Sequence, residues 1–123
     1  MLKDSLYSIL SLKDEGNGTY IADITVNADH SIFDGHFPGQ PVLPGVCQIE
    51  MVKELLMEIK KQSCRLLSAG TIKFLKVVDP NQDSNIQFKL DIHEEEKNLK
   101  VTIESTLKDG SPNFKLKGNF ALT

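Results

Sequence analysis

His36 and Glu50 are the two side chains of this sequence that are best suited to transfer protons. His36 lies near the start of the stretch GHFPGQPVLPGVCQIE, and Glu50 ends it. Proline fixes φ and glycine permits unusual φ values, so this loop is expected to have a defined shape. A base and an acid that face one space could remove a proton from a carbon next to a carbonyl group and protonate a leaving hydroxyl, with net loss of water.

The helix that is expected to begin at Gly45 supplies a third component for this chemistry. The N–H groups of a first helical turn lack partners within the helix, and the helix dipole favours negative charge there. Those near Gly45 and Val46 could therefore hold the enolate-like oxygen of a thioester substrate. Glu50 must carry its proton when it acts, and an apolar setting or the nearby carboxylate of Glu54 would favour that form.

Each of these residues also has a purely structural interpretation. A solitary loop histidine is more often a structural residue than a catalytic one. Cys47 could be a nucleophile paired with His36, but a small buried thiol is the favoured role. Glu50 could be a solvated glutamate, because on a helical wheel it shares an arc with charged residues: Lys53, Glu54, Glu58, Lys60 and Lys61.

The elements that must position these residues follow from periodicity. Apolar residues at helical spacing, with Pro44 at the start, predict one long helix over 45–61. Alternation of apolar and polar residues predicts strands, at 86–92, 99–103, 114–122, 20–26, 68–78 and 6–12. One helix with five or six antiparallel strands is an α+β plan, and residues 1–123 are expected to form a single domain.

Composition excludes several classes of function. A net charge of −3 argues against nucleic acid as the main partner. The sequence contains no run of about 18 apolar residues and no secretory signal, so we expect a cytoplasmic protein without a membrane span. Cys47 and Cys64 are expected to be reduced, and their spacing predicts no metal site.

The predicted helix is apolar over more than one face. Its additional apolar residues favour burial on two sides, as in a homodimer: Val46, Cys47, Met51 and Met57. The alternative is that the sheet of the same chain curves around the helix and encloses it.

The stretch from residue 35 to 50 closely resembles the signature GHFPGxPxxPGVxxxE of the hotdog-fold (3R)-hydroxyacyl-acyl carrier protein dehydratases. The segment 72–83, IKFLKVVDPNQD, resembles the strand and turn that follow the helix in that family. The resemblance implies an antiparallel sheet wrapped around the helix, and dimers with active sites at the subunit interface. It assigns His36 and Glu50 as catalytic residues from different subunits, and Gly45, followed by Val46, to the thioester oxygen.

The resemblance implies that a (3R)-hydroxyacyl thioester loses water to give a trans-2-enoyl thioester, in fatty-acid or related polyene and lipid biosynthesis. The substrate is then carried on the phosphopantetheine of an acyl carrier protein, and no further cofactor is expected. A stretch without acidic residues is a candidate docking patch for that acidic partner: Lys60, Lys61, Arg65, Lys73 and Lys76. Departures from the family pattern include Glu54, where glutamine is usual, Val77 and Asn81.

Two other functions remain open from the sequence. Hotdog proteins also include acyl thioesterases, in which a carboxylate on the same helix activates water. A non-catalytic acyl-binding subunit of a heterodimer is the third possibility, although such a subunit would need neither His36 nor Glu50. Phe33 and Phe37 could line an acyl pocket or pack in the core.

Overall fold

The computed structural model describes residues 1–35 and 39–123. His36 and Phe37 therefore lie outside the described residues. The elements are β1 (Tyr7–Gly16), β2 (Thr19–Val26), α1 (Ile32–Gly35), α2 (Gly45–Lys60), β3 (Cys64–Phe74), β4 (Asn85–Glu95), β5 (Asn98–Leu107) and β6 (Pro112–Leu122).

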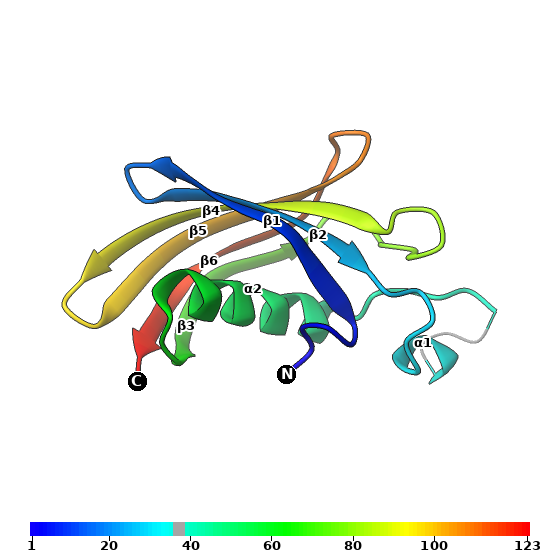
Figure 1. Cartoon of the computed structure of the whole chain (residues 1–123), viewed down its shortest axis with the longest axis horizontal. Coiled ribbons are helices and arrows are strands. Elements are labelled where there is room, and N and C mark those ends of the chain that lie inside the picture. The colour runs from blue at the N-terminus through cyan, green and yellow to red at the C-terminus, as the bar shows by residue number, and fades with distance from the viewer. Residues whose placement is uncertain (36–38) are drawn as a thin grey trace.

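The strands of the described residues form one six-stranded antiparallel sheet in the order β1-β2-β4-β5-β6-β3. The sheet curves, and α2 lies along its concave side (Figure 1). This arrangement confirms the predicted α+β plan. It also leaves β1 and β3 as the two edge strands, each paired on one side only within the chain.

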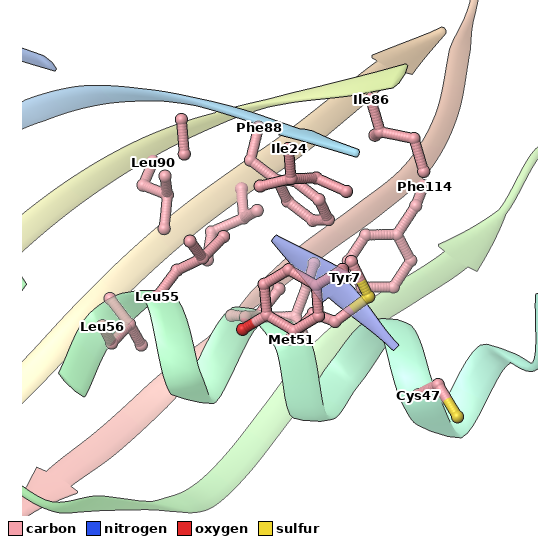
Figure 2. Close-up of a cluster of buried hydrophobic side chains, with 14 of the residues drawn as sticks. Tyr7, Ile24, Cys47, Met51, Leu55, Leu56, Ile86, Phe88, Leu90 and Phe114 are labelled. Carbon is pink, nitrogen blue, oxygen red and sulfur yellow. The ribbon is translucent and has the colours of Figure 1, made fainter. Parts of the chain in front are cut away.

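Alternating apolar residues of the strands and one face of α2 build the core. Met51 and Leu55 of α2 are fully buried and point towards the sheet, where Phe88 of β4 and Ile24 of β2 lie (Figure 2). Each large apolar side chain that is removed from water in this way contributes about 1.5–3 kcal/mol to folding. The helix is therefore fixed to the sheet along most of its length.

Several predicted boundaries differ from the structure. The helix ends at Lys60 rather than 61, because Lys61 adopts the left-handed conformation with φ of 54°. β3 was predicted over 68–78, but it starts and ends four residues earlier. It ends at Phe74 because the N–H groups of Leu75 and Lys76 turn to the carbonyl oxygen of Asn113. The short helix α1 was not predicted.

The predicted absence of a membrane span can be checked only against helices. In residues 1–35 and 39–123, no helix combines the length and the apolar character that crossing a membrane requires.

Candidate active site

In the first turn of α2, two backbone N–H groups have no acceptor among the described residues. Pro44 precedes the helix in an extended conformation, and no side chain caps the helix. The N–H groups of Cys47 and Gln48 donate to the carbonyl oxygen of Pro44, whereas no described residue accepts from those of Gly45 or Val46. The side chain of Val46 is exposed, with 74% of its surface accessible. Within residues 1–35 and 39–123, no acceptor thus competes with a ligand for the two predicted oxyanion donors.

An apolar cavity of about 390 Å³ adjoins this turn. Its lining residues come from the loop before α2, from α2 itself and from the end of β3 and the segment after it: Val42, Leu43, Gly45, Gln48, Phe74, Leu75, Lys76, Val77 and Val78. A larger hollow of about 540 Å³ lies over β1, β2, β4 and the end of β5, and no residue of α2 lines it. The cavity of about 390 Å³ is the candidate site, because Gly45, at the start of α2, lines it.

The aromatic ring of Phe74 packs directly against Gly45 at the start of α2. A Cβ atom at this position would lie 2.6 Å from Cζ of Phe74, which is too close for a real side chain. The ring of Phe74 in turn contacts Phe114, with ring centroids 5.4 Å apart. The absence of a side chain at Gly45 therefore lets Phe74 form part of the cavity wall beside the oxyanion donors.

Glu50 lies on a different face of α2 from the cavity. Its side chain is 42% exposed and its nearest ion-pair partner is Lys53, at 3.9 Å. Glu50 follows Gln48 by two positions, so the two side chains point about 160° apart on the helix. Within one chain, Glu50 and the lining of the cavity do not meet. The placement of His36 relative to Glu50 lies outside the described residues.

Glu54 is buried although the helical wheel placed it on a charged arc, whereas the side chains of Glu50 and Lys61 on the same arc are exposed. Glu54 is 0% exposed and accepts three hydrogen bonds, from the N–H groups of Leu2 and Lys3, at 2.8 Å each, and from the hydroxyl of Tyr7, at 2.9 Å. Burial, together with the Glu54 carboxylate, raises the pKa of Tyr7. The carboxylate of Glu54 therefore binds the N-terminal segment to α2, and no local pattern signals this because the partners are distant in sequence.

The two cysteines have the predicted reduced form and are buried. Burial, and next the charge of Glu50, raises the pKa of the Cys47 thiol. A raised pKa keeps the thiol protonated at neutral pH, which disfavours a nucleophilic role.

The five residues of the predicted docking patch fall into two groups. Lys60 and Lys61 lie at the end of α2 and Arg65 at the start of β3, whereas Lys73 lies at the end of β3 and Lys76 two residues beyond it. By the rise of a strand, Arg65 and Lys73 are about 25 Å apart. Three of the lysines form ion pairs, as Lys60 does with Glu94, Lys61 with Glu58 and Lys76 with Asp109. Only the group at the end of β3 adjoins the cavity, through Lys76.

Comparison with known proteins extends the resemblance of the motif to most of the chain. A family model described as ApeI-like, ApeI dehydratase, matches residues 12–112. The 3-hydroxyacyl-[acyl-carrier-protein] dehydratase FabZ of Rickettsia bellii is 35% identical over 81 residues, which cover 59% of this chain and 54% of the relative. FabZ of Rickettsia typhi is 31% identical over 91 residues, covering 68% and 61%. The chain thus spans little more than half the length of these curated relatives.

Solved structures share the fold. The dehydratase heterocomplex ApeI:P from Xenorhabdus doucetiae matches with a TM-score of 0.76 at 20% identity, covering 92% of this chain and 96% of that one. A hypothetical thioesterase from Streptococcus pneumoniae, crystallised with coenzyme A, matches with a TM-score of 0.63 at 15% identity, covering 98% and 91%. These likenesses establish the hotdog fold, and the family match establishes that the chain belongs to the ApeI-like dehydratase family.

Proposed function

We propose that this protein removes water from a (3R)-hydroxyacyl thioester on an acyl carrier protein to give a trans-2-enoyl thioester. The observation that carries the proposal is the pair of N–H groups at Gly45 and Val46, which have no acceptor in the described part of the chain, beside an apolar cavity. Family membership and the dehydratase names of the relatives support it. The substrate brings its own phosphopantetheine, and the reaction needs no other cofactor.

Each group in the site has one task in this mechanism. His36 accepts the proton from C2 of the substrate, and negative charge grows on the thioester oxygen. The N–H groups of Gly45 and Val46 stabilise that charge, because donors already in place cost no reorganisation. As the C2–C3 double bond forms, the C3–O bond breaks and Glu50 gives its proton to the departing hydroxyl. The products are the enoyl thioester and water, with His36 protonated and Glu50 ionised until they exchange protons with solvent.

The position of Glu50 supports a site shared between two chains. Glu50 points away from the cavity of its own chain, so the acid for that cavity comes from a second copy. This division is the one that the resemblance to the hotdog dehydratases implies. A homodimer, or a higher assembly of dimers, is therefore part of the proposal.

The surface around β3 suits the contact between the two copies. β3 is an edge strand, and most of its residues are exposed. Exposed apolar side chains gather on β3, on the segment after it and at the start of α2: Leu66, Leu67, Ile72, Phe74, Leu75, Val77 and Val46. An apolar edge strand of this kind invites pairing with another strand. Pairing of β3 with β3 of a second copy would cover it.

The carrier protein is proposed to dock beside Lys73 and Lys76. Lys76 lines the cavity and Lys73 lies three residues before it in β3, so a phosphopantetheine arm that starts beside Lys76 has a short path to the oxyanion donors. Lys60, Lys61 and Arg65 are distant from the cavity and are left out of the proposed contact.

Intact-mass analysis of a trans-2-enoyl carrier protein incubated with the enzyme tests the proposal, because dehydration is reversible. Gain of one water on the acyl group supports it. Loss of the acyl group would instead identify a thioesterase, and no change over several chain lengths would favour a non-catalytic acyl-binding subunit.

Two variants test the shared site. His36→Ala and Glu50→Ala should each be inactive while remaining folded. Mixing the two after exchange of subunits should restore about one quarter of the wild-type activity, because half of the dimers then carry one intact site. Mixtures that stay inactive despite confirmed subunit exchange would contradict a site built from two chains.

A further inference from the structure

A chain of three buried polar side chains leads from the sheet to the cavity. The hydroxyl of Ser105 donates to Oδ1 of Asn113 at 2.8 Å, and Nδ2 of Asn113 donates to Oε1 of Gln48 at 3.1 Å. Ser105 and Asn113 are fully buried, and Gln48 is 4% exposed. Buried polar groups are costly unless they are paired, so such a chain in an apolar core calls for a specific explanation.

An irregularity in β6 places Asn113 in this chain. Ser105 pairs with Phe114, whereas Thr106 pairs with Pro112, so Asn113 is the extra residue of a β-bulge. A bulge redirects a side chain that would otherwise follow the alternation of the strand. The carbonyl oxygen of Asn113 also accepts from Leu75 and Lys76, which line the cavity. Asn113 thus holds in place both Gln48 and the part of the cavity wall that Leu75 and Lys76 form.

The amide nitrogen of Gln48 has no partner in the described part of the chain. Its oxygen is held by Asn113, and no described residue accepts a hydrogen bond from Nε2. Every fully buried side-chain nitrogen or oxygen among the described residues does have a partner, so Nε2 must retain some accessible surface. Gln48 lines the cavity, which is where that surface opens.

The position of Gln48 in α2 indicates what this donor binds. Gln48 follows Gly45 by three residues, or about 4.5 Å along the helix axis. A carbonyl oxygen held by the N–H groups of Gly45 and Val46 therefore lies within reach of the Gln48 side chain. The rest of the cavity wall is mostly apolar and suits an acyl chain.

We propose that Gln48 is a substrate-binding residue whose Nε2 donates a hydrogen bond to the carbonyl oxygen of the acyl thioester, and that Asn113 positions it. This inference rests on the proposed function. It adds a side-chain donor to the backbone donors of the oxyanion site. Because charge grows on this oxygen as the C2 proton leaves, the hydrogen bond strengthens in the transition state.

Kinetics of Gln48→Leu provide the first test. Leucine has a similar volume and no donor, so kcat should fall on the order of 100-fold, as for loss of one oxyanion donor, with a smaller change in KM. The matched control is Gln62→Leu, which replaces an exposed glutamine beyond the end of α2 and should retain wild-type kinetics. Circular dichroism and the oligomeric state of both variants show whether they fold normally.

Direct binding provides the second test and does not depend on turnover. The probe is butyryl-N-acetylcysteamine, a saturated thioester that can be neither hydrated nor dehydrated. In ¹⁵N spectra of the wild-type protein, it should shift the side-chain amide of Gln48 and the backbone amides of Gly45 and Val46, but not the side-chain amide of Gln62.

The two tests separate failure of this inference from failure of the proposed function. If the wild-type protein hydrates the enoyl carrier protein while Gln48→Leu keeps its kcat and the Gln48 amide does not shift, the inference is wrong and the proposed function stands. If the wild-type protein does not hydrate any enoyl substrate and the probe shifts neither Gly45 nor Val46, both are wrong.

Discussion

The buried carboxylate of Glu54 should make a large contribution to stability. It accepts hydrogen bonds from two backbone N–H groups and from the hydroxyl of Tyr7. A hydrogen bond to a charged group contributes roughly 1.5–3 kcal/mol, and a buried donor left without its partner costs about 1–3 kcal/mol. The hydroxyl of Tyr7 is buried, whereas the N–H groups of Leu2 and Lys3 can regain water if the N-terminal segment detaches. We therefore expect Glu54→Leu to lower the free energy of unfolding by about 3–5 kcal/mol.

Glu54→Gln separates the hydrogen bonds from the burial of the side chain. Glutamine keeps one oxygen for Tyr7 and Lys3 and presents an NH₂ group to the N–H of Leu2, so the expected loss is only about 1–2 kcal/mol. Urea unfolding followed by circular dichroism measures both values, and Glu15→Leu, at an exposed carboxylate, is the control. If Glu54→Leu unfolds at the same urea concentration as the wild-type protein, the carboxylate does not anchor the N-terminal segment.

Two further predictions concern the edge of the sheet and the pH dependence of stability. Leu67→Lys places a charge on exposed β3 and should convert the proposed dimer to monomers in light scattering, whereas Leu10→Lys, on the opposite edge strand, should not. A dimeric Leu67→Lys variant would exclude this interface. Burial and Glu54 raise the pKa of Tyr7, so the folded state retains a proton that the unfolded state loses above pH 10 or so. With rising pH, the free energy of unfolding of the wild-type protein should then fall by up to about 1.4 kcal/mol per pH unit more than that of Tyr7→Phe. Urea unfolding between about pH 9 and 11 measures both slopes, and equal slopes would refute this.

The parts of the fold that could be predicted are those encoded by neighbouring residues. The alternation in 86–92 identified β4 because one face of that strand packs on the core and the other faces solvent. Apolar spacing and Pro44 identified the start of α2, since both signals are local. The end of β3 was missed because the carbonyl oxygen that captures Leu75 and Lys76 belongs to Asn113, which is distant in sequence.

The same distinction applies to the candidate site. The motif predicted that Gly45 and Val46 lie in the first turn of a helix, and α2 begins at Gly45 because that signal is local. Glu54 and Gln48 were not assigned their buried roles, because their partners Tyr7 and Asn113 lie 47 and 65 residues away along the chain. A helical wheel places Glu54 with exposed charges, and only the folded N-terminal segment shows why a carboxylate is stable there.

In the proposed mechanism, the opposite orientations of Gln48 and Glu50 allow α2 to serve two sites. The face with Gly45 and Gln48 closes the cavity of its own chain, where the carbonyl oxygen must be held firmly. The face with Glu50 is partly exposed and is free to supply an acid to a second chain. The groups that bind the thioester carbonyl oxygen and the acid that protonates the hydroxyl on C3 must approach the substrate from different directions, because C3 and the carbonyl oxygen lie apart. Placing the two functions on opposite faces of α2 meets this requirement only if two helices meet at each site.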